Sequence, residues 1–184
     1  MRPVLITLGV LVAGSALAQH AGHQHQPQPS GYAGLQSREI KSLSPEQLAD
    51  LREGRGMGVS LLAELNSVPG PMHVLELAER LKVTTEQRRT LERIAADMKA
   101  RAQGLGAQVV VEEASLDKAF KGRIVDAKEV EEATARIASL QGQLRAVHLV
   151  AHLKTRDVLS DDQVAAYDSA RGYKSLASLQ APRH

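Results

Sequence analysis

The 184-residue sequence contains no cysteine and no tryptophan, and its aromatic rings are limited to one phenylalanine and three tyrosines. The absence of cysteine excludes disulfide scaffolds, thiol catalysis and cysteine-based zinc sites. Because aromatic rings normally supply much of the buried area of a globular core, this core must be built from leucine, valine, isoleucine and alanine. Leucine and alanine are strong helix formers, so the composition favours an all-α fold.

A strong excess of either charge is also missing, because 23 lysines and arginines stand against 21 aspartates and glutamates. Domains that bind nucleic acid usually concentrate basic residues on one face, so we expect no nucleic acid partner. The Gly54-Arg-Gly-Met-Gly run lacks the Lys-Ser/Thr pair of a phosphate-binding loop. No other catalytic arrangement of side chains is recognisable, and we expect that the protein is not an enzyme.

The N-terminal residues have the pattern of a secretory signal peptide. Arg2 supplies a positive charge, residues 4–18 are uncharged, and Ala16-Leu17-Ala18 is a small-x-small cleavage site. The uncharged run is shorter than the roughly 20 residues of a membrane-spanning helix, and polar residues follow it. We therefore expect residues 1–18 to be cleaved after Ala18, giving an exported protein without stable membrane insertion.

Residues 19–36 are rich in histidine, glutamine and proline and lack apolar periodicity, which predicts a disordered arm. His20, His23 and His25 lie in this arm and are candidate ligands for a metal ion. Cleavage after Ala18 would place His20 second in the mature chain. The tight amino-terminal copper chelate, which needs histidine at position three, is therefore excluded.

One short pattern occurs three times: an apolar residue, serine or threonine, any residue, an acid, and glutamine. The copies are Leu43-Ser44-Pro45-Glu46-Gln47, Val83-Thr84-Thr85-Glu86-Gln87 and Leu159-Ser160-Asp161-Asp162-Gln163. Each predicts a capping box, in which the hydroxyl accepts from the first helical turn and the glutamine reaches back. The pairs Ser44 and Gln47, Thr84 and Gln87, and Ser160 and Gln163 are thus expected to begin three helices.

Apolar residues recur at steps of three and four through the second half of the chain, which predicts two long amphipathic helices. The first is expected from Thr85 to Lys121, ended by Gly122, and the second begins at the cap Asp126. Their apolar residues are Leu91, Ile94, Met98, Ala102, Leu105, Val109, Leu116 and Phe120, then Val130, Ala133, Ile137, Leu140, Leu144, Val147 and Ala151. We expect a long antiparallel hairpin, covered by short helices and by a second protomer in a homodimer.

Shorter helices are expected on both sides of this hairpin. An amphipathic segment from Gly58 to Val68 carries Leu61, Leu62 and Leu65. After Pro69-Gly70-Pro71, His73 to Leu81 directs Val74, Leu77, Ala78 and Leu81 inward. A last helix reaches about Arg171, and residues 174–184 form a loose tail. Gly104, Gly106 and Gly142 lie inside the long helices and indicate either close helix contacts or a bend.

The repeated motif around a long helical hairpin, behind an export signal and without cysteine, resembles the Spy/CpxP family of periplasmic proteins. That family is marked by a repeated Leu-Thr-x-x-Gln motif, and the second and third copies here depart from it by reading Val-Thr and Leu-Ser. The resemblance covers Leu43 to Tyr173 and implies one helical domain over residues 37–173. The Gly54–Gly58 run with Pro69–Pro71 is similar to a metal-resistance branch.

The resemblance implies two functions. The first is an ATP-independent chaperone or envelope-stress protein of the periplasm, which holds unfolded clients and requires no cofactor. The alternative is a heavy-metal-binding sensor or buffer in a metal-resistance system, with an envelope-stress regulator as a further candidate partner. The family motif marks the fold and does not choose between them.

His148 and His152 are the candidate metal ligands within the helical domain, because their i, i+4 spacing places both imidazoles on one helix face. Such a pair can chelate zinc, copper, nickel or cobalt, and some sensors of the family use a histidine on this helix. The apolar neighbours allow the alternative that both are structural. A glutamate directly after the first histidine, which a zinc protease would need, is missing. We interpret Met57, Met72 with His73, and Met98 as core or turn residues rather than copper(I) ligands.

Overall fold

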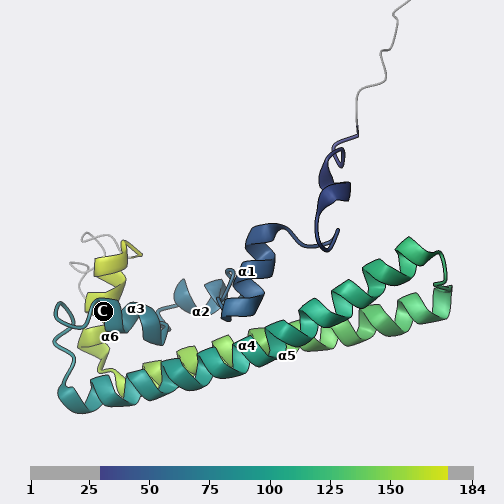
Figure 1. Ribbon diagram of the computed structural model, residues 1–184. Coiled ribbons are helices and arrows are strands. Elements are labelled where there is room, and N and C mark those ends of the chain that lie inside the picture. The colour runs from purple at the N-terminus through teal and green to yellow at the C-terminus, as the bar shows by residue number, and fades with distance from the viewer. Residues whose placement is uncertain (1–29, 174–184) are drawn as a thin grey trace, which may run out of the picture. The chain divides into compact units, whose positions relative to one another are not determined.

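The computed structural model describes residues 30–173. In that part of the chain every regular element is a helix (Figure 1), and the predicted all-α class is therefore confirmed. The expected signal peptide and its cleavage after Ala18, the arm histidines, and the tail at residues 174–184 lie outside the described residues. The chain divides into two units, residues 1–33 and 34–184, and the following description concerns the second.

The helices of this unit are short at the start and long in the middle. They are η1 (Leu35–Ser37), α1 (Pro45–Glu53), α2 (Leu61–Glu64), α3 (Pro71–Glu76), α4 (Thr85–Gly122), α5 (Ala127–Val158) and α6 (Asp161–Arg171). With 38 and 32 residues, α4 and α5 are the two longest. Among residues 30–173, no helix is both long enough and apolar enough to cross a membrane.

Helices α4 and α5 pack side by side along their length (Figure 1). The side-chain amide of Gln87, in the first turn of α4, donates to the carbonyl of Val158 at 2.8 Å. Farther along, Arg136 of α5 donates to Glu112 of α4 at 3.1 Å. The first turn of α4 therefore lies beside the last turn of α5.

All three predicted capping boxes are formed, with both reciprocal bonds in each. The hydroxyls of Ser44, Thr84 and Ser160 each accept from the glutamine backbone nitrogen at 3.2 Å. A fourth box, between Asp126 and Glu129, begins α5. The start of each of these helices is thus fixed by local sequence, because each cap satisfies backbone N–H groups that have no partner inside the helix.

Two of the motif glutamines also bind each other, across 76 residues of sequence. Nε2 of Gln87 donates to Oε1 of Gln163 at 2.9 Å, and Nε2 of Gln163 donates to Oε1 of Gln87 at 3.0 Å. Gln163 further donates to the carbonyl of Leu81 at 3.2 Å. A capping glutamate could not replace this exchange, since it lacks the amide donor. The motif therefore joins the beginnings of α4 and α6 as well as capping them.

Two apolar clusters form the core. The first gathers residues from α3, α4, α6 and the segments that precede α4 and α6: Val74, Leu81, Leu91, Leu159, Val164 and Tyr167. The second joins α1 to the middle of α4 and α5: Leu51, Ala102, Val109, Leu144 and Val147. The core is almost wholly aliphatic, as the composition requires, and Tyr167 is its one buried ring among the described residues.

Gly106 is required by the packing of α1 on α4. A Cβ at this position would collide with the backbone carbonyl of Leu51 in α1. Gly104 and Gly142 have open space around them. Of the two explanations that the sequence left open, close helix contact therefore applies to Gly106.

The expectation for residues 58–68 is wrong. Only Leu61–Glu64 is helical, and Leu61, Leu62 and Leu65 are more than half exposed, whereas Glu64 is the buried residue of α2. The helix ends at Glu64, and the left-handed backbone of Ser67 (φ 62°) turns the chain before Val68. Polar contacts of Glu64, described below, turn the leucines outward.

Three further expectations need correction. Helix α3 is shorter than predicted and begins two residues earlier, at Pro71, although Val74, Ala78 and Leu81 are buried as expected. Phe120 is exposed, because the buried residues of α4 end at Val109. Gly122 belongs to α4, and the left-handed capping conformation is adopted by Arg123 (φ 54°).

We predict that Gln87→Glu or Gln163→Glu lowers the free energy of unfolding by about 1–3 kcal/mol, since each removes a donor from a partly buried pair and adds a charge. Gln47→Glu is the matched control, because Gln47 caps α1 without a partner from another helix among the described residues. Urea denaturation of the three variants checks this. Equal losses in all three would show that the glutamine exchange adds nothing to capping.

Candidate functional site

Four segments that are distant in sequence meet at one cavity of about 380 Å³, one of them α4 with Met98 and Lys99. The glycine run after α1 contributes residues 53–56, and the start of α3 contributes residues 70–73. His148 and His152 of α5 line the same cavity. The glycine run, the Pro-Gly-Pro run and the histidine pair, which the sequence singled out separately, therefore belong to one site.

His148 is buried, with 3% of its surface exposed. Its Nε2 has no hydrogen-bond partner in the described part of the protein. The backbone of Gly56 lies against the ring, since a Cβ on Gly56 would be 3.4 Å from Nδ1 of His148. Loss of hydration on burial, and secondarily the nearby His152, lower the pKa of His148 below its ordinary value. A neutral imidazole at neutral pH follows.

His152, one turn farther along α5, is held in one tautomer. Its Nδ1 lies 2.7 Å from the carbonyl oxygen of Val68. A carbonyl can only accept, so Nδ1 carries the hydrogen and Nε2 of a neutral ring keeps a lone pair. Gly70 is needed beside it, because a Cβ there would lie 2.8 Å from this Nε2.

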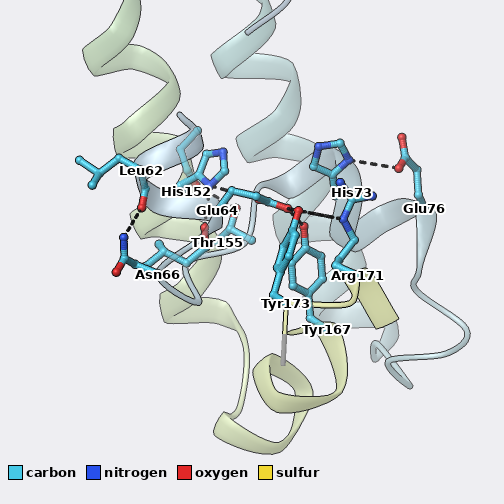
Figure 2. Close-up of polar contacts among 12 residues, drawn as sticks. Leu62, Glu64, Asn66, His73, Glu76, His152, Thr155, Tyr167, Arg171 and Tyr173 are labelled. Atoms are coloured by element: carbon cyan, nitrogen blue, oxygen red, sulfur yellow. Dashed lines mark hydrogen bonds and ion pairs between the residues drawn. The ribbon is translucent and has the colours of Figure 1, made fainter. Parts of the chain in front are cut away.

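Glu64 lies beside His152 and ties α2 to α6 (Figure 2). The hydroxyls of Tyr167 and Tyr173 both donate to its Oε1, the second at 3.1 Å. Arg171 is 3.6 Å from the same oxygen. Burial, followed by the bond to Glu64, raises the pKa of Tyr167. The remaining oxygen, Oε2, lies 3.9 Å from Nδ1 of His152.

A second cavity of about 300 Å³ shares part of this lining. Both cavities are bordered by Gly56, Ser60, His73 and His152, and Glu64 and Met57 border only the second. His73 also lies 3.2 Å from Glu76 in α3. The histidine pair thus lies beside a further imidazole and a buried carboxylate.

Methionine side chains complete the first cavity. Met72 of α3 and Met98 of α4 both line it. Met72 is 49% exposed and Met57 is 41% exposed. Met57 lies in a turn, as one of the two interpretations expected. Met72 lies in α3 with half of its surface exposed, so it is neither a core nor a turn residue.

The structure brings His148 and His152 together at the cavity, and it buries both. His20, His23 and His25 lie outside the described residues. Within residues 30–173, no three or more histidine, aspartate or glutamate side chains are arranged as a metal-binding group. The sequence analysis did not identify Glu64 as a functional residue. The one signal for it was a single acidic residue within the leucine-rich segment 61–65.

No protein-family model, curated protein or solved structure matches the chain.

We predict that the metal-free protein loses stability as the pH falls below about 6.5, the ordinary pKa of histidine. In that range the unfolded chain binds a proton that buried His148 resists, so the unfolded state gains stability. One such group contributes a slope of at most about 1.4 kcal/mol per pH unit. Urea unfolding at pH 5 to 8 measures the slope.

His148→Gln should flatten this slope, because the side chain no longer titrates. His73→Gln, at an exposed histidine of the same cavity, is the control and should keep the slope. A slope that is the same in the parent and in His148→Gln would contradict the assigned burial of a neutral imidazole.

Proposed function

We propose that this protein is an exported metal-binding protein, a sensor or buffer of the metal-resistance kind, with His148 and His152 as ligands. The observation that carries the proposal is the pair of buried imidazoles at one cavity. One has its tautomer fixed by Val68, and the other has a ring nitrogen without a hydrogen-bond partner within the described residues.

The environment of the pair suits a metal ligand. Histidines that bind metal usually donate their other ring hydrogen to a carbonyl or carboxylate, which orients the ring and raises its basicity. The bond from His152 to Val68 has this form. The lowered pKa of His148 keeps its ring unprotonated at neutral pH, and an unprotonated nitrogen is the one that binds metal.

The arrangement of the long helices and the oligomeric state are part of the same proposal. We infer a helical hairpin of α4 and α5 in a homodimeric periplasmic protein, on the basis of the motif repeat and the packing of the two helices. The histidine-rich arm would capture metal weakly. The helical hairpin and the repeated motif agree with the resemblance to the Spy/CpxP family.

We predict that the parent protein binds at least one of zinc, copper, nickel and cobalt, and that His148→Ala with His152→Ala weakens this binding by at least about tenfold. Removing a residue that only hydrogen-bonds to a metal ligand already lowers metal affinity about 10–100-fold. Removing the ligands themselves should lower the affinity by at least as much. Calorimetric titration measures the affinity.

The controls are His73→Ala, which removes a histidine from the rim of the same cavity, and replacement of His20, His23 and His25 by alanine. The His73→Ala variant should bind metal as tightly as the parent. The variant without the three arm histidines should lose only weak metal-binding sites. Binding that is unchanged when His148 and His152 are replaced would remove the proposed function.

A second candidate function, the holding of unfolded clients without ATP, is favoured by one observation. Large aliphatic side chains are exposed on α2, which contacts α5, and on α5 itself. They are Leu61, Leu62, Leu65, Val150 and Leu153. Exposed large apolar side chains mark binding surfaces where they gather on one face of a protein. Client binding through them would be broad and aliphatic, and a bound metal could regulate it.

We predict that replacing Leu61, Leu62 and Leu65 by serine removes suppression of client aggregation without unfolding the protein, because all three are already exposed. Val111→Ser, at an exposed apolar residue elsewhere on α4, is the matched control. Light scattering of a chemically denatured client, diluted without ATP, gives the measurement. A parent protein that suppresses nothing at several-fold excess would eliminate this function.

A further inference from the structure

The cavity at the histidine pair combines imidazole with thioether side chains. His148 and His152 approach it from α5, Met72 from α3 and Met98 from α4. The two thioether side chains therefore belong to α3 and α4, whereas the two imidazoles belong to α5. Methionine is unbranched and flexible, and half-exposed Met72 can turn its sulfur without disturbing the core.

The charges around this cavity are balanced. The charged residues of its lining, apart from His73, are Glu53, Arg55 and Lys99. Arg55 pairs with Asp50 as well as with Glu53, so these two acids offset Arg55 and Lys99. The choice of ion therefore depends on the chemistry of the donor atoms that line the cavity.

The buried carboxylate nearest to the histidines lies outside this cavity. Oε1 of Glu64 accepts from two tyrosine hydroxyls and lies near Arg171, and Oε2 lies 3.9 Å from Nδ1 of His152, on the side of the ring that binds Val68. Glu64 borders the second cavity and is not part of the lining of the first. The histidine and methionine side chains of the first cavity therefore offer imidazole nitrogen and thioether sulfur.

Thioether sulfur selects soft ions, and copper(I) is the soft ion that methionine and neutral imidazole bind together. Copper(I) also accepts few ligands, so two imidazoles and one or two thioethers suffice. Nε2 of His148 is buried without a hydrogen-bond partner in residues 30–173. Because no acceptor there holds a hydrogen on it, this nitrogen is free to present its lone pair to a metal ion.

We propose that this cavity is a copper(I) site formed by His148 and His152 together with the thioethers of Met72 and Met98. The inference rests on the proposed metal-binding function and names its metal. It also assigns a role to Met72 and Met98, which the sequence analysis placed in the core or in turns.

The test uses the full chain with His20, His23 and His25 replaced by alanine, so that the arm does not bind metal. Copper(I) is titrated without oxygen against a coloured copper(I) chelator, and zinc(II) is titrated separately. The variants are Met72→Leu with Met98→Leu, and Met57→Leu as the matched control, because Met57 borders only the second cavity. Circular dichroism melting confirms that each variant is folded.

The proposal predicts that the double methionine variant binds copper(I) at least about tenfold more weakly than the parent. Tenfold is the smaller loss of metal affinity that follows even when only a partner of a ligand is removed. Zinc(II) affinity should stay within about twofold, since zinc prefers imidazole to thioether. Met57→Leu should match the parent. X-ray absorption of the copper(I)-loaded parent should show sulfur neighbours, which the double variant lacks.

Copper(I) affinity that is unchanged in the double methionine variant would overturn the inference, as would an absorption spectrum with nitrogen neighbours alone. Failure of the underlying function gives a different result. In that case neither copper(I) nor zinc(II) affinity changes when His148 and His152 are replaced by alanine.

Discussion

The hydrogen bond from Nδ1 of His152 to the carbonyl of Val68, at 2.7 Å, fixes the segment between α2 and α3 to α5. The backbone of Gly70 lies against the same imidazole ring. A Cβ at this position would come within 2.8 Å of Nε2 of His152, so only glycine fits there. The same bond determines which nitrogen of His152 carries the hydrogen. One contact thus sets the path of a loop, the tautomer of a histidine and the lining of a cavity.

The aliphatic composition explains how the surrounding fold is held together. The two clusters on α4 contain one large ring, that of Tyr167, and polar contacts between distant segments reinforce them. Gln87 and Gln163 exchange amide hydrogen bonds at the starts of α4 and α6. The hydroxyl of Tyr167, the one buried tyrosine in residues 30–173, binds Glu64. These contacts stabilise the fold, because a buried polar group without a hydrogen-bond partner lowers the free energy of unfolding.

Much of the helical organisation could be predicted from local sequence. The capping boxes at Ser44, Thr84 and Ser160 act over three residues, so the sequence places the starts of α1, α4 and α6 directly. The spacing of His148 and His152 on one helix face is local in the same sense. Their burial at a common cavity is not, because it depends on loops that return from residues 53–73.

The errors come from contacts between residues far apart in sequence. Glu64 is buried because Tyr167, 103 residues later, donates to it, and this turns Leu61 and Leu62 outward against their apolar pattern. Periodicity ranks side chains by polarity alone and cannot register such a partner. Met72 was likewise assigned by residue type, whereas its place at the cavity depends on how α3 meets α4 and α5.

The central claim is that the carbonyl of Val68 holds a hydrogen on Nδ1 of His152, so that Nε2 is the nitrogen that can offer a lone pair to a metal ion. Long-range nitrogen–proton NMR spectra of the metal-free, ¹⁵N-labelled protein at mildly alkaline pH measure this tautomer directly, with His152→Gln used to assign the signals. The account predicts a protonated-type shift for Nδ1 and an unprotonated-type shift for Nε2. The opposite tautomer would contradict it.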